Sequence, residues 1–159
     1  MKLEFILNGE DVLVESDVEN RLVDILRKSF MLLGTKLGCY TGCCGACMVI
    51  LNGTVVNSCL IPAFKIQGSE IITIEGFSQT DDYNDIVTGF SDAGVTDCGF
   101  CHTGKILATG ALIGRNLRPS KEEILPAFFG IKCRCTDSTE LVKGVMAAAE
   151  HRRKRLYGS

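Results

Sequence analysis

Four cysteines in the first half of the chain have the spacing of an iron–sulfur ligand set. Cys39, Cys44 and Cys47 follow the pattern C-x4-C-x2-C, and Cys59 lies twelve positions after Cys47. This is the spacing of the thiolates that hold a plant-type 2Fe–2S cluster, in which two irons each take two soft anionic sulfur ligands. Glycines between these cysteines allow the backbone to turn tightly around an inorganic core. The segment therefore predicts a site for one-electron redox chemistry.

Four further cysteines form a second group in the other half of the chain. Cys98 and Cys101 follow C-x2-C, Cys133 and Cys135 follow C-x-C, and each pair comes just before a predicted helix. Unpaired N–H groups and the positive end of a helix dipole favour anionic thiolates at such positions. By spacing alone the group fits an iron–sulfur cluster or a zinc ion, and Cys98 to His102 also matches the attachment sequence of c-type haem. Haem would leave Cys133 and Cys135 without a role, whereas zinc stays open as an alternative.

The composition describes a chain that can fold around a packed core. Hydrophobic residues make up 46% of its 159 residues, and the net charge of -2 argues against nucleic acid as the main partner. The sequence has no apolar stretch of membrane-spanning length, and Met1 to Glu4 lack the apolar core of a signal peptide. We therefore expect a cytoplasmic protein, in which clustered cysteines bind metal or carry out redox chemistry. The ninth cysteine, Cys43, is expected to be a small packed residue beside the first group.

Residues 1–76 carry the pattern of a small sheet with one helix. Strands are expected over residues 2–8, 12–14, 48–51, 54–56 and 71–74. Asn-Gly pairs at Asn8 and Asn52 predict the tight turns of two hairpins, and the second hairpin returns the chain to Cys59. Apolar residues at helical spacing over residues 21–28 predict a helix, with Asn20 as its cap. This half has the organisation of a ferredoxin.

The second half carries helical patterns after a polar stretch. Residues 77–85 predict a surface linker between two domains, and its acidic residues, Asp81, Asp82 and Asp85, are expected to face solvent. Helices are expected over residues 83–93, 103–113, 120–128 and 139–152. Ser120 and Glu123 have the spacing of a capping box. We therefore expect an N-terminal domain over residues 1–76 and a helical domain over residues 86–159.

Four motifs together resemble a known family. They run from Gly38 to Cys47, from Asn57 to Leu60, from Cys98 to Cys101 and from Cys133 to Thr136. In this order and with these separations they are similar to the small iron–sulfur subunit of the molybdenum hydroxylases, which are the xanthine dehydrogenase, aldehyde oxidoreductase and carbon monoxide dehydrogenase type enzymes. The resemblance implies an α+β fold, with an N-terminal β-grasp ferredoxin-like domain followed by a C-terminal four-helix bundle domain.

The resemblance also implies two 2Fe–2S clusters, each held by four cysteines. The ligands of the N-terminal cluster would be Cys39, Cys44, Cys47 and Cys59. The ligands of the C-terminal cluster would be Cys98, Cys101, Cys133 and Cys135. Phe100, which lies between two of these cysteines, is expected to shield the C-terminal cluster from water.

The function that the resemblance implies is electron transfer within an oxidoreductase complex. A large subunit would hold molybdopterin and oxidise the substrate, and single electrons would pass through the C-terminal cluster and then the N-terminal cluster toward FAD in a medium subunit. The complex would be a heterotrimer or a dimer of heterotrimers, and this chain would have no catalytic residue or substrate site of its own. A free-standing two-cluster ferredoxin or redox sensor is the alternative, and a ferredoxin domain joined to a zinc-binding module is a third hypothesis.

The sequence departs from the family's pattern around the second cysteine group. Asp97 stands where the family usually has Gln, a side chain that approaches the pterin, and His102-Thr103 stands where it has Thr-Pro. An ionised Asp only accepts hydrogen bonds, so at least one contact with the pterin would change. These changes fall on the face expected to meet the molybdenum subunit, which predicts a divergent partner. The basic run 151–155 is expected to complement the dipole of a helix end.

Overall fold

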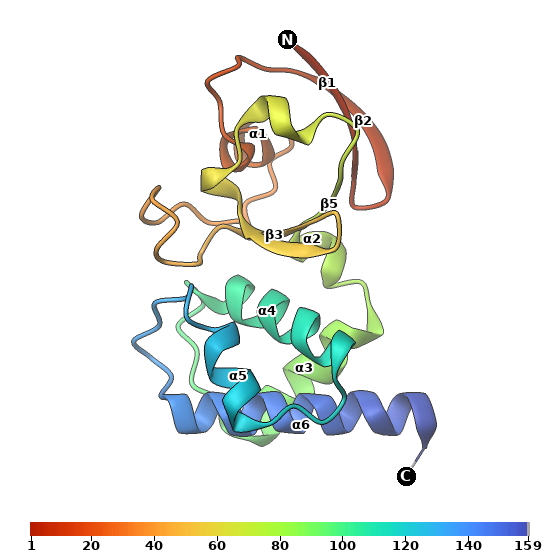
Figure 1. Cartoon of the computed structure of the whole chain (residues 1–159), viewed down its shortest axis with the longest axis vertical. Helices are drawn as coiled ribbons and strands as arrows, with labels where there is room; N and C mark the ends of the chain where they lie inside the picture. The colour runs from red at the N-terminus through yellow and green to blue at the C-terminus, as the bar shows by residue number, and fades with distance from the viewer. Residues whose placement is uncertain (159) are drawn as a thin grey trace.

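The computed structural model describes residues 1–158 and has the α+β architecture expected from the sequence. A small sheet lies above a layer of helices, and the N-terminus and the C-terminus lie at opposite ends of the molecule (Figure 1). The strands are β1 (Lys2–Leu7), β2 (Glu10–Glu15), β3 (Met48–Leu51), β4 (Thr54–Asn57) and β5 (Glu70–Ile72). Their order in the sheet is β2-β1-β5-β3-β4, in which β1 and β5 are parallel and the other neighbours are antiparallel.

Both predicted hairpins form at their Asn-Gly pairs. Asn8 and Gly9 have φ values of 51° and 87°, and Asn52 and Gly53 have values of 48° and 81°. Positive φ at both central residues is the conformation of the type I′ turn, which matches the twist of the flanking strands. The second hairpin ends in a short 3-10 helix, η1 (Ser58–Leu60), and therefore fixes the position of Cys59.

Strand β3 is covered on both faces of the sheet, whereas Lys2, Glu4 and Ile6 of β1 are exposed. On one face, helix α1 (Leu22–Lys28) packs its residues Leu22, Ile25 and Leu26 against β1 and Val49 of β3. On the other face, Met48 packs into the core of the helical layer. Because side chains alternate between the faces of a strand, β3 contributes to both cores and joins the two layers.

Two local expectations in the N-terminal half are wrong. The strand expected over residues 71–74 ends at Ile72, and a short helix, α2 (Ile74–Phe77), follows. The side chain of Asn8 ends the strand, because its Oδ1 accepts a hydrogen bond from the backbone N–H of Thr73 at 2.8 Å. Asn20 does not cap α1: the N-cap position belongs to Arg21, and Asn20 donates to the Ser16 hydroxyl instead. A second 3-10 helix, η2 (Ala63–Ile66), had no signal in the sequence.

Four helices form the C-terminal half, as the apolar periodicity predicts. They are α3 (Asp81–Asp92), α4 (His102–Arg115), α5 (Lys121–Ala127) and α6 (Ser138–Tyr157). The predicted capping box of Ser120 and Glu123 is present at the start of α5. Helices α3 and α6 approach closely at Gly89, where an added Cβ would lie 2.3 Å from the backbone nitrogen of Ala148. Among residues 1–158, the structure has no helix with the length and apolar character needed to cross a membrane.

The expected linker is shorter than the polar composition suggests. Residues 81–85 begin α3, and the hydroxyl of Thr80 caps this helix by accepting from the Tyr83 N–H at 3.2 Å. Asp82 and Asp85 face α6 rather than open solvent, since Arg155 lies 2.6 Å and 2.8 Å from their carboxylates. The acidic run therefore belongs to a helix start that is paired with the basic end of α6. The division into domains at residues 77–85 stays a prediction.

Candidate metal centres

The first cysteine group lies in the loop between α1 and β3, with Cys59 in η1 beside it. The Sγ atom of Cys39 accepts hydrogen bonds from the backbone N–H groups of Thr41, Cys43 and Cys44 at 3.3, 3.2 and 3.3 Å. Such a ring of N–H donors stabilises an anionic sulfur. A hydrogen bond from the Thr41 side chain, together with these backbone donors, lowers the pKa of Cys39 to about 5.

The other end of this group is buried. Cys47 and Cys59 are buried under Val23 of α1 and Tyr40. Burial, followed by the neighbouring Cys47 thiol, raises the pKa of Cys59 to about 11. A thiol in such a place becomes a thiolate only when a cation replaces its proton, as iron or zinc does. The group therefore combines an anionic sulfur at Cys39 with a thiol at Cys59 that ionises when it binds a metal.

The loop requires glycine at two positions beside the cysteines, Gly38 and Gly42. A Cβ added at Gly38 would lie 2.8 Å from the Sγ of Cys44. Gly42 has a φ of 75°, and a Cβ added there would lie 2.4 Å from the Leu60 side chain. Larger residues would push side chains or backbone into the space between the cysteines. The donor set and this close backbone fit a sulfur-ligated cluster. Cys43 is exposed, which contradicts the expectation that it is packed.

Arg21 fixes the two ends of the first group, and the sequence offered no sign of this role. Its Nη1 donates to the carbonyl oxygens of Tyr40 at 2.8 Å and of Cys59 at 3.0 Å. Its guanidinium carbon also lies 4.4 Å from the centroid of the Tyr40 ring. These carbonyls come from segments that are far apart in the sequence, so only the fold brings them to one side chain.

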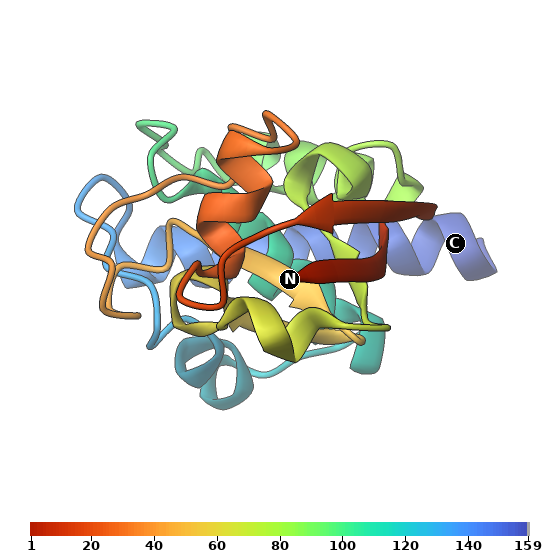
Figure 2. The same cartoon turned by 90° about the horizontal axis from the view of Figure 1, so that it is seen from above.

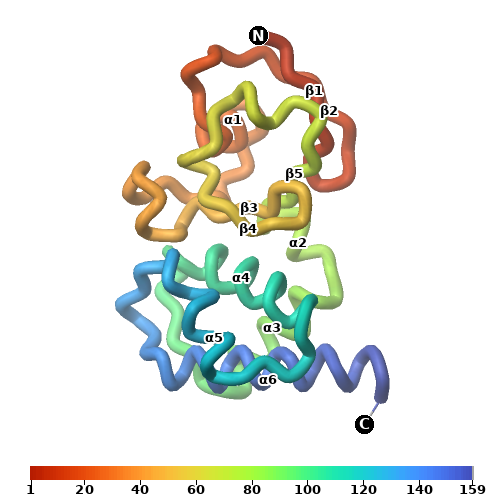
Figure 3. The backbone as a smooth tube through the Cα atoms, in the orientation of Figure 1, coloured from red at the N-terminus to blue at the C-terminus, as the bar shows by residue number. Residues whose placement is uncertain are grey.

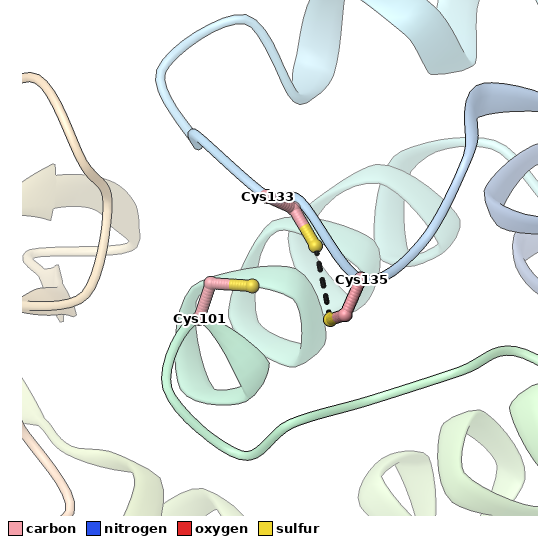
Figure 4. A group of neighbouring side chains, drawn as sticks. All are labelled: Cys101, Cys133 and Cys135. Atoms are coloured by element: carbon pink, nitrogen blue, oxygen red, sulfur yellow. Dashed lines mark hydrogen bonds between the residues drawn. The ribbon is translucent and has the colours of Figure 1, made fainter.

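The second cysteine group converges at the N-terminus of α4. The Sγ atoms of Cys101, Cys133 and Cys135 point toward one another and lie within 4.8 Å of each other, with 3.4 Å between the last two (Figure 4). Cys101 is the buried N-cap residue of α4, and the C-x-C pair comes from the loop before α6. The exposed Cys98 completes the group, because its Sγ lies within 4.8 Å of the Cys135 Sγ.

The thiols of this group contact one another, and this changes how readily each one ionises. Burial, followed by the neighbouring Cys133, raises the pKa of Cys101 to about 12. Burial opposes ionisation of Cys133 as well, but hydrogen bonds from the Cys101 thiol and from the N–H groups of Cys135 and Thr136 outweigh it and lower the pKa to about 6. The Cys101 thiol thus donates a hydrogen bond to the Cys133 thiolate, and a bound metal would take the place of the shared proton.

Three polar side chains, Asp97, His102 and Lys105, adjoin these sulfurs in an arrangement that the spacing did not reveal. The side chain of Lys105 has an exposed fraction of 0%, and its Nζ lies 3.8 Å from the Cys133 Sγ and 3.7 Å from an Asp97 carboxylate oxygen. The other Asp97 oxygen contacts the Nδ1 of His102. Burial, followed by the charges of Lys105 and Lys36, lowers the pKa of His102. Asp97 is therefore engaged within the chain.

The two cysteine groups lie close together where the two layers meet. The loops that carry them lie at the same end of the molecule in both side and top views (Figures 2 and 3). The backbone N–H of Lys132 donates to the carbonyl of Cys44 at 3.1 Å, and the Thr103 hydroxyl donates to the carbonyl of Gly34 at 2.9 Å. Phe100 lies beside Gly38 of the first group and 47% of it is exposed, so its role as a shield of the C-terminal cluster stays a prediction.

Two family models divide the chain between the two cysteine groups. A model described as a 2Fe-2S iron-sulfur cluster binding domain matches residues 5–71. A model described as a [2Fe-2S] binding domain matches residues 73–146. Together with the sulfur donor sets, these matches show that both halves bind 2Fe–2S clusters. The zinc and haem alternatives for the second group are therefore wrong.

Curated relatives and solved structures match the chain along nearly its whole length. The nicotinate dehydrogenase small FeS subunit of Eubacterium barkeri is 40% identical over 91% of this chain and 92% of its own. The nicotine 6-hydroxylase small subunit of Paenarthrobacter nicotinovorans is 34% identical over 93% of this chain and 89% of its own. The crystal structure of quinoline 2-oxidoreductase from Pseudomonas putida 86 superposes with a TM-score of 0.88 at 30% identity, over 100% of this chain and 98% of that chain.

Proposed function

Because this chain belongs to the family of small iron–sulfur subunits of the molybdenum hydroxylases, we propose that it passes single electrons from molybdopterin in a large partner subunit toward FAD in a medium partner subunit. When bound, the two 2Fe–2S clusters supply the one-electron carriers, and the chain supplies their spacing, burial and hydrogen bonds. Bond-making chemistry then belongs to the large subunit. The substrate is selected there as well.

We assign each set of four cysteines to one cluster. The N-terminal set is Cys39, Cys44, Cys47 and Cys59, and the C-terminal set is Cys98, Cys101, Cys133 and Cys135. The convergence of three sulfurs within 4.8 Å and the ring of N–H donors on Cys39 support these assignments. Cys43 lies outside both sets.

The observation that carries the proposal is the hydrogen bond between Lys132 and Cys44. Lys132 is the chain neighbour of Cys133, and its N–H donates to the carbonyl of Cys44 at 3.1 Å. A ligand of one proposed cluster is therefore joined to a ligand of the other by a few covalent bonds and one hydrogen bond. This short connection supports electron transfer between the two halves.

Apolar side chains around the cysteines support docking against partner subunits. Leu37, Leu60, Phe100 and Phe129 have exposed fractions of 42%, 56%, 47% and 80%. Large exposed apolar side chains near one another are typical of protein interfaces. We propose a heterotrimer or a dimer of heterotrimers in the cytoplasm. The pterin contact expected of the family's Gln would differ here, because the Asp97 carboxylate is held by His102 and Lys105.

Purification of the tagged full chain from its own host under anaerobic conditions tests this proposal. We expect a large subunit with molybdenum and pterin and a medium subunit with FAD to co-purify. The complex is then assayed with nicotinate and quinoline, the compounds named for the relatives above. Recovery of the chain as a monomer, without molybdenum or flavin in any associated fraction, would contradict the proposal and favour a free-standing two-cluster ferredoxin.

A further inference from the structure

The buried ammonium group of Lys105 is the feature that the proposed function leaves unexplained. Lysine is almost never fully buried unless its charge is paired, because removal of an ammonium from water is costly. The side chain of Lys105 has an exposed fraction of 0%, although it stands in a helix whose neighbouring positions, Ile106 and Leu107, fill the apolar core. Something at this place must stabilise a positive charge.

The partners of the ammonium group include a sulfur of the second cysteine set. Its Nζ lies 3.0 Å from the Thr136 hydroxyl, 3.7 Å from Asp97 and 3.8 Å from the Cys133 Sγ. The Asp97 carboxylate is shared, since it also contacts His102 and accepts the Gly99 N–H at 2.9 Å. One shared carboxylate offsets the ammonium only in part, and an anionic cluster at Cys133 would supply the remaining negative charge.

We propose that Lys105 is a fixed positive charge that raises the reduction potential of the C-terminal cluster. This inference rests on the proposed function, because it requires a 2Fe–2S cluster on Cys133. Reduction of that cluster adds one electron to an assembly that is already anionic, with no bond made or broken. The electron comes from the molybdenum subunit in the complex and from dithionite in a titration. A cation in a buried, low-dielectric place stabilises the more negative state.

The potential, rather than stability or activity, distinguishes this role from simple packing. Lys105→Met keeps a long side chain in the helix but removes the charge. Lys132→Met is the matched control, because Lys132 is the chain neighbour of Cys133 but its side chain is exposed, where water and salt screen its charge. The readout is a redox titration of the full chain followed by electron paramagnetic resonance. The C-terminal signal is identified as the one that Cys133→Ser abolishes.

We expect Lys105→Met to lower the C-terminal potential by about 59 mV or more, which is a tenfold smaller equilibrium constant for one-electron reduction. Lys132→Met is expected to shift it by less than half as much. An unchanged potential in Lys105→Met, or equal shifts in the two variants, would overturn the inference. A wild-type chain with only one paramagnetic signal would instead contradict the proposed function, so the two failures are distinguishable.

Asp97→Asn provides a second variant in case Lys105→Met does not assemble its cluster. Removal of this carboxylate takes away a negative charge beside the same sulfurs, so the C-terminal potential is expected to rise. If these side chains only filled space, the potential would not fall in Lys105→Met and rise in Asp97→Asn. A potential that stays constant or falls in Asp97→Asn would overturn the inference whatever the outcome with Lys105→Met.

Discussion

Gly104→Ala tests the contact that brings the two cysteine groups together. Gly104 lies in the first turn of α4, and a Cβ there would lie 2.4 Å from the carbonyl oxygen of Gly45, in the loop that carries the first group. Ordinary contact begins at 3.4 Å, so the loop and the helix must separate by about 1 Å. A backbone carbonyl cannot rotate aside as a long side chain can. The cost of such overpacking is about 1–3 kcal/mol.

Gly114→Ala is the matched control, because it makes the same change near the other end of the same helix. A Cβ at Gly114 meets open space within 4 Å among the described residues. Both variants gain about 0.5–1 kcal/mol of helix propensity, so their difference isolates the clash at Gly104. At about 2–4 °C per kcal/mol for a chain of this size, Gly104→Ala should melt about 2–12 °C below Gly114→Ala.

The assay is thermal denaturation of the cluster-loaded chain without oxygen, followed by its visible absorbance. The scan rate is kept fixed because cluster loss makes unfolding irreversible. Wild type is expected between the two variants or close to Gly104→Ala, since the propensity gain offsets part of the clash. If Gly104→Ala melts as high as Gly114→Ala, the close approach of α4 to the loop of the first group is wrong.

Two further predictions concern the first cysteine group. Arg21→Gln removes the charged hydrogen bonds to the carbonyls of Tyr40 and Cys59, which are worth about 1.5–3 kcal/mol. The N-terminal cluster should therefore bleach faster in air, while the paramagnetic signal of the C-terminal cluster persists. Equal decay of both signals would refute this. In the apoprotein, the pKa of Cys39 is lowered to about 5 and that of Cys59 is raised to about 11, so at pH 7 the first is a thiolate and the second a thiol. Iodoacetamide followed by peptide mass spectrometry should therefore label Cys39 first, and faster labelling of Cys59 would contradict the geometry of the apo loop.

Features that depend on neighbouring residues in the sequence could be predicted. The hairpins at Asn8 and Asn52 follow from Asn-Gly pairs, whose conformational preference is local. The four helices follow from apolar periodicity, and the capping box at Ser120 from side chains three positions apart. The cysteine spacing likewise indicated sulfur ligation, because the required thiolates lie on short loops.

Features that depend on contacts between distant segments could not be predicted. The acidic run at residues 81–85 resembles a linker until α6 places Arg155 beside it, 2.8 Å from Asp85. Arg21 contacts two carbonyls that the fold alone brings together. Lys105 has no motif of its own, and its role depends on the return of the Cys133 loop to the start of α4. The spacing of residues in the sequence does not reveal charged groups whose partners lie far away along the chain.

The most direct measurement is the iron and sulfide content of the anaerobically purified chain, together with that of Cys133→Ser. We expect about four irons and about four sulfides per wild-type chain, with two distinct paramagnetic signals after reduction. Cys133→Ser should keep about two irons and only the N-terminal signal. Fewer irons in the fully loaded wild type, or both signals undisturbed in Cys133→Ser, would contradict the assignment of two clusters to this chain.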